Sequence, residues 1–128
     1  MAALTDLAAR GASPGEVAAA VADMWQSIYT DLSKVIGSRG MYALYQRSLH
    51  LTCVPFPWLA TVRDAPAHAG EFDALRDALS QHSNTTALAA NSSLLENFRN
   101  LLSNLIGGSL TERLLSAALD EHFERPQP

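Results

Sequence analysis

Apolar side chains recur at three- and four-residue steps along most of this chain, which is the spacing of one face of an α-helix. The clearest run covers residues 84–119 and is interrupted once, at Gly107-Gly108. Its apolar positions are Leu88, Leu94, Leu95, Phe98, Leu101, Leu102, Leu105 and Ile106, then Leu110, Leu114, Leu115, Ala118 and Leu119. The pattern predicts two amphipathic helices that are neighbours in space, because their connection is very short.

Capping residues mark the ends of these two helices. Thr85 or Asn84 can accept hydrogen bonds from the first free backbone amides, and the glycine pair can adopt the left-handed conformation that ends a helix. After the glycines, Ser109 and Glu112 have the spacing of a capping box, in which each side chain bonds the other residue's backbone amide. We therefore expect one helix to begin near Thr85 and the next at Ser109.

A long helix is also predicted in the first half of the chain. The segment Ser13-Pro14-Gly15-Glu16 combines an N-cap serine, a proline at the first helical position and a glutamate at the third. Helical spacing then continues up to Gly37 through Val17, Val21, Met24, Trp25, Ile28, Leu32, Val35 and Ile36. This helix should present a wide apolar face.

Shorter helices are expected between the two long ones. The first begins at Ser38 or Gly40 and must end by Val54, since the prolines that follow disfavour the helical conformation in the residue before each of them. Pro57 can open a short helix, and residues 64–70 have the composition of a surface loop. A modest helix is then expected over residues 71–81.

The predicted fold is an all-α bundle of five to seven helices, orthogonal or up-down, closed by the helix-Gly-Gly-helix pair. The 128 residues fit a single domain, 1–128. Residues 1–12 allow either a short helix capped by Thr5 or a frayed end, and residues 125–128 read as a polar tail. No run alternates as a strand would, and no internal repeat occurs at the spacing of a solenoid.

Charge is scarce, and this bears on partners. Charged residues make up 17% of the chain, where about 25% is typical of soluble domains. We infer that another subunit or a partner covers part of the apolar surface, and a homodimer is the simplest form of this. The net charge of −4 lies in the second half, and a single lysine with no basic cluster argues against nucleic acid as a partner.

Cysteine usage and hydropathy bear on the compartment. Cys53 is the only cysteine, so the chain cannot be a secreted disulfide scaffold. The first residues lack the basic start of a secretory signal, and no apolar stretch has the length of a membrane span. A cytoplasmic, bacterial-type protein without a membrane association is the simplest interpretation.

Recognised catalytic patterns are missing from the sequence. It contains no nucleophile elbow, P-loop or glycine-rich dinucleotide turn, and its histidines are not spaced as metal ligands. We therefore expect no catalytic residues, no cofactor and no metal. Histidine phosphotransfer through His50 is a weaker hypothesis, because the residues after it differ from those usual in that class. A haem pocket with His50 or His82 as ligand is weaker still.

Two sets of residues remain as candidate contact sites. One is an apolar pocket lined by Trp25, Phe56, Trp58 and Phe98, which would suit a small apolar ligand. The other is a stripe of asparagines that could hydrogen-bond across an interface, made of Asn97, Asn100 and Asn104. The sequence favours a non-catalytic interaction or regulatory module acting as a homodimer, with a small-molecule sensor or carrier as the alternative.

Overall fold

The computed structural model of the chain describes residues 6, 7, 9–64 and 72–123, with only the backbone described for 120–123. These residues form α-helices and one turn of 3-10 helix, and no strand occurs among them. The elements in order are α2 (Pro14–Ile36), α3 (Ser38–Thr52), η1 (Pro57–Leu59), α4 (Ala60–Asp64), α5 (Asp73–Ser80), α6 (Asn84–Ile106) and α7 (Gly108–Phe123). The all-α bundle is therefore confirmed. The predicted Thr5 cap, most of the loop over 64–70 and the tail 125–128 lie outside the described residues.

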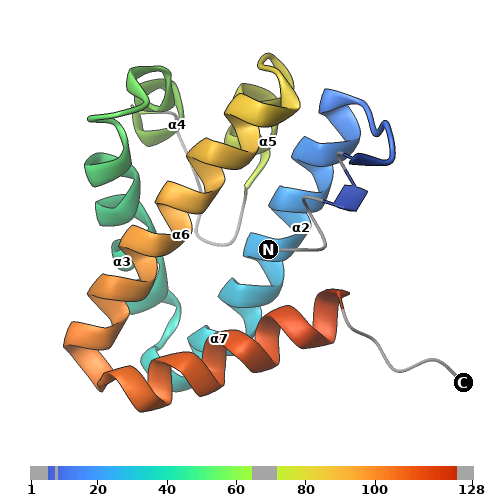
Figure 1. Cartoon of the computed structure of the whole chain (residues 1–128). Helices are drawn as coiled ribbons and strands as arrows, with labels where there is room; N and C mark the ends of the chain where they lie inside the picture. The colour runs from blue at the N-terminus through green and yellow to red at the C-terminus, as the bar shows by residue number, and fades with distance from the viewer. Residues whose placement is uncertain (1–5, 8, 65–71, 124–128) are drawn as a thin grey trace, which may run out of the picture.

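The two long helices α2 and α6 hold the other helices together. Helix α3 packs against both of them, α5 packs on α2, and α7 crosses one end of the molecule in contact with α2 and α6 (Figure 1). The core between them is apolar, and its largest fully buried side chains belong to Trp25, Phe98, Met24, Ile28, Leu32, Met41, Leu49, Leu59, Leu75, Leu79 and Leu94. No described helix combines the length and apolar character that crossing a membrane requires.

The start of α2 is the one that the sequence predicts. The Ser13 hydroxyl accepts a hydrogen bond from the Glu16 amide at 3.2 Å, and the Ser13 amide donates to the Glu16 carboxylate at 3.0 Å. Helix α6 begins one residue earlier than expected. Its N-cap is Ser83, whose hydroxyl accepts from the Thr86 amide at 3.2 Å, so Asn84 is the first helical residue and neither Asn84 nor Thr85 is the cap.

The predicted capping box at the start of the last helix is wrong. Helix α7 begins at Gly108, so Ser109 already lies within its first turn. The carboxylate of Glu112 instead lies 3.2 Å from Nε of Arg99, on the neighbouring helix α6. Only Gly107 of the glycine pair has a positive φ, because a single residue is enough to turn the chain between the two helices.

The fold contains an internal repeat of two helix-glycine-helix units. We call α2 and α3 the N-terminal unit, and α6 and α7 the C-terminal unit. Helices α2 and α6 have 23 residues each, and each ends at a glycine of nearly the same conformation, Gly37 (φ 83°, ψ 155°) and Gly107 (φ 93°, ψ 151°). The amides of these glycines donate to the carbonyls of Ser33 at 2.9 Å and Ser103 at 2.8 Å.

Burial follows the same order in both units. Aligned on their glycines, every position from Met24 to Met41 is buried, half-buried or exposed as its equivalent is from Leu94 to Thr111. The packing is reciprocal as well, since α3 lies against α6 while α7 lies against α2. The two units therefore face each other as the two halves of a pseudo-symmetric pair.

Candidate functional site

Two of the four predicted pocket residues, Trp25 and Phe98, lie in the centre of the core. Both are fully buried, and their rings meet edge to face with centroids 5.3 Å apart. The indole Nε1 of Trp25 donates to Oδ1 of Asn91 at 2.8 Å. Asn91 is itself only 1% exposed, so this hydrogen bond joins α2 to α6 inside the apolar core. Tyr45 and Phe72 also contact the Trp25 ring.

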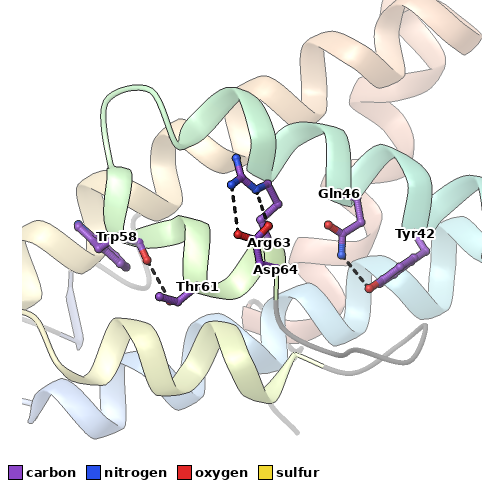
Figure 2. A network of polar contacts seen from close by, with 6 residues as sticks. All are labelled: Tyr42, Gln46, Trp58, Thr61, Arg63 and Asp64. Carbon is purple, nitrogen blue, oxygen red and sulfur yellow. Dashed lines mark hydrogen bonds and ion pairs between the residues drawn. The ribbon is translucent and has the colours of Figure 1, made fainter.

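The other two, Phe56 and Trp58, are half-buried in the segment after α3. Their ring centroids are 6.3 Å apart, and the Trp58 ring stacks on His82 with centroids 3.9 Å apart. The Thr61 hydroxyl donates to the Trp58 carbonyl at 3.0 Å, which ties η1 to the start of α4 (Figure 2). The four predicted aromatics thus form two pairs in different surroundings. We call Phe56, Trp58 and His82 the aromatic cluster.

The three asparagines of the predicted interface stripe are used differently. The Asn97 amide nitrogen donates to Oγ1 of Thr52 at 2.9 Å, and Thr52 in turn donates to the Ser48 carbonyl at 2.7 Å. Asn97 therefore joins α6 to α3 within the chain. Asn100 and Asn104 are exposed on α6. Of the three, only these two are open to solvent.

The groups with potential reactivity are dispersed. His50 is exposed in the last turn of α3, and His82 belongs to the aromatic cluster, while His68 and the side chain of His122 lie outside the described residues. Among the side chains that the structure describes, no group of three or more His, Cys, Asp or Glu lies close enough to hold a metal ion. These positions bring no catalytic arrangement together.

Cys53 and its surroundings form a small polar edge at the end of α3. Burial raises the pKa of the half-buried Cys53 thiol, Arg63 opposes this and Asp64 adds to it. Arg63 and Asp64 form an ion pair at 2.9 Å (Figure 2), and this hydrogen bond lowers the pKa of Asp64. The raised pKa keeps the thiol protonated, which makes it a poor nucleophile.

Large apolar side chains are exposed where the two units turn. Val35 is 51% exposed and Leu105 is 61% exposed, and the two occupy equivalent positions just before the glycines of their units. Both turns lie toward the same end of the molecule (Figure 1). Periodicity places both residues on apolar faces, but the structure exposes them at the edge of those faces, while Ile36 and Ile106, one residue further along, pack against the core. We call Val35 and Leu105 the elbow pair.

Sequence reasoning missed the repeat, the Asn91 hydrogen bond and the elbow pair. The repeat had a visible signal, because the glycines that end the long helices are each preceded by the same residues at the same distances. Matching pairs are Ser13 with Ser83, Leu32 with Leu102, Ser33 with Ser103, Ile36 with Ile106 and Gly37 with Gly107. A comparison of the chain with itself would have found this pattern, whose spacing is longer than that of a solenoid repeat.

Comparisons of the chain with protein-family models, with curated proteins and with solved structures find no match.

Proposed function

We propose that this chain is a non-catalytic interaction module that acts as a homodimer. The observation that carries the proposal is the repeat, in which two units bury equivalent faces against each other. A face that fits an equivalent unit of its own chain also fits that unit in a second copy, as in other two-fold assemblies. The expected cytoplasmic location remains part of the proposal.

Surface composition supports the same proposal. Charged residues are only 17% of the chain, and the exposed large apolar side chains among the described residues are Val35, Leu51, Val54 and Leu105. Single exposed apolar side chains are normal on a soluble domain, so it is the low share of charged residues that supports a covered surface.

Size-exclusion chromatography with light scattering tests the homodimer. We expect a species of twice the chain mass of 13.8 kDa at tens of micromolar, with dissociation on dilution. A single species at the mass of one chain over the whole concentration range would contradict the proposal. The exposed charge variant Asp23→Asn is a suitable control, because Asp23 lies on the outer face of α2.

The aromatic cluster favours one further candidate function, a sensor or carrier of a small apolar ligand. Trp58 is half-buried, its ring stacks on His82, and Phe56 lies beside it. Flat apolar ligands stack on such rings. Trp25 and Phe98 are fully buried and take no part in this version of the site.

Ligand binding at the aromatic cluster is tested by thermal shift and tryptophan fluorescence with a panel of apolar metabolites. A ligand that binds the folded chain must raise its melting temperature. The matched control is Trp58→Ala, in which Trp25 remains as the only tryptophan. A thermal shift that persists in this variant would place the ligand elsewhere, and no shift with any compound would contradict the carrier function.

A further inference from the structure

Each unit packs against helices of the other unit, and a second copy of the chain carries the same helices. Helix α3 of the N-terminal unit packs on α6, and α7 of the C-terminal unit packs on α2. The buried Trp25–Asn91 hydrogen bond and the Asn97–Thr52 hydrogen bond both cross this contact. All of these contacts can form equally well between two copies of the chain, because they depend on surfaces and not on the connection between the units.

The connection that leads into the C-terminal unit is short. Only residues 81–83 separate α5 from α6, and the sequence has no glycine or proline from Phe72 to Ile106. Helix breakers therefore do not enforce this turn. Exchange of elements between chains occurs at short hinge loops of this kind, because a short connection that opens can join its two helices into one.

The backbone of this hinge leaves the helical region at Ser83, while Gln81 is still within it. Gln81 has φ −89° and ψ 0°, within reach of the helical region, and Ser83 has φ −64° with ψ 158°. The φ of Ser83 is that of a helix, so at this residue it is ψ that must rotate for the chain to continue helically. Opening gives up the Ser83 cap, the Trp58–His82 stack and the hydrogen bond from Asn84 to the Ala12 carbonyl at 2.8 Å.

We propose that the homodimer forms by exchange of the C-terminal unit. The hinge at residues 81–83 opens so that α5 and α6 become one helix, and α6 and α7 of each chain pack on α2 and α3 of the second copy. This inference rests on the proposed homodimer and specifies how its two chains are joined. The elbow pair of each half remains as it is in the single chain.

The first test fixes the turn with a proline. Asn84→Pro places proline at the first position of α6, where the helix does not use the amide, and the extended Ser83 is compatible with a following proline. The N-terminal unit has this same arrangement, with Pro14 after Ser13. A continuous α5–α6 helix cannot accept it, because the proline ring would clash with the carbonyl of Ser80.

We expect Asn84→Pro to convert the dimer into a monomer of 13.8 kDa by light scattering. The matched control Asn84→Ala loses the same hydrogen bond to Ala12 but allows the helix to continue, so it should remain dimeric. An Asn84→Pro protein that remains dimeric would overturn the exchange while leaving the homodimer intact. If the unmodified chain is monomeric at every concentration, the homodimer and the exchange both fail.

The second test asks which chain supplies each unit. In a Cys53→Ser background, Thr52→Cys with Asn97→Cys replaces two side chains whose polar atoms lie 2.9 Å apart. Oxidation of the dimer should give a covalent pair of chains on a non-reducing gel, whereas a cross-link within single chains would overturn the exchange. A charged elbow pair, Val35→Glu with Leu105→Glu, should leave the exchanged dimer unchanged, and its dissociation would indicate a side-by-side contact instead.

Discussion

The two units of this fold share one backbone arrangement but fill it with different side chains. Both use a 23-residue helix, a glycine with positive φ and a second helix, and both bury the same positions around the turn. Yet Trp25 and Tyr45 of the N-terminal unit correspond to Leu95 and Leu115 of the C-terminal unit, and Met41 corresponds to Thr111. The order of buried and exposed positions therefore determines the shape of the unit, while several side chains can fill each position.

The buried side chains of the two units differ because the N-terminal unit also packs against α5. Helix α5 packs on α2, and Phe72 at its start contacts the rings of Trp25, Tyr29 and Tyr45. The larger aromatic side chains of the N-terminal unit fill the space between that unit and α5. Aromatic groups are favoured there because each buries a large area and meets its neighbours edge to face.

The largest effects should come from equivalent leucines in the two long helices. Leu32 and Leu102 occupy the same position of their units and both are fully buried. Each truncation to alanine should lower the free energy of unfolding by about 2–5 kcal/mol, from lost apolar contact and the cavity that remains. Urea unfolding followed by far-ultraviolet circular dichroism measures both. If one truncation were tolerated at no cost while the other lay in this range, the two units would not be energetically equivalent.

A smaller effect is expected where the units differ most, at the buried asparagine. Val21 is the equivalent of Asn91, so Asn91→Val copies the N-terminal unit into the C-terminal one. It leaves the indole Nε1 of Trp25 buried without its acceptor, which should cost about 1–3 kcal/mol. The double variant with Trp25→Phe removes the donor as well, and its loss in chemical denaturation should be smaller than the sum of the two single losses. Strict additivity would show that this hydrogen bond is not significant for stability.

Much of the fold was predictable because local signals and burial agree in the long helices. The capping box of Ser13 with Glu16 and the turn after Ile36 both appear as the pattern predicts. The start of α7 was not predictable. A serine followed three residues later by a glutamate occurs both where the serine caps a helix and where the helix begins before the serine. In the structure α7 begins before Ser109, and Glu112 forms an ion pair with Arg99 of α6 in place of the expected capping box.

The candidate sites were less predictable than the fold. Periodicity places Val35 and Leu105 on apolar faces, but it does not show how far round each helix the neighbouring helices reach, and both residues are left exposed while the isoleucine after each packs against the core. Periodicity also groups Trp25, Phe56, Trp58 and Phe98 only as large aromatics, while their separation into the core and the aromatic cluster depends on the bend after α3. Contacts between distant segments settle such questions, and one sequence does not give them.

The turns provide a test at the point where the units agree most closely. Gly37→Ala and Gly107→Ala should each cost about 1–3 kcal/mol, since both glycines have a φ and ψ that residues with a side chain rarely adopt. A Cβ at either position would meet nothing within 4 Å, so the loss would come from the backbone and not from a clash. Gly15→Ala is the control, because Gly15 lies in the first turn of α2 without a positive φ. Thermal unfolding that spares either turn variant would show that its glycine is not required.

The smallest effect is expected at the ion pair that is special to the C-terminal unit. Arg99 lies between Glu112 at 3.2 Å and Glu96 at 3.3 Å, while the equivalents of Arg99 and Glu112 in the N-terminal unit are Tyr29 and Tyr42. The carboxylates are largely exposed, so Glu112→Gln should cost no more than about 1 kcal/mol. Glu96→Gln removes a pair within α6 alone and should cost less. Because water and salt screen both pairs, the difference between the variants and the unmodified chain should shrink in high salt. A larger loss for Glu112→Gln that persists in high salt would mean that the ion pair, and not the apolar packing of the repeat, holds α7 against α6.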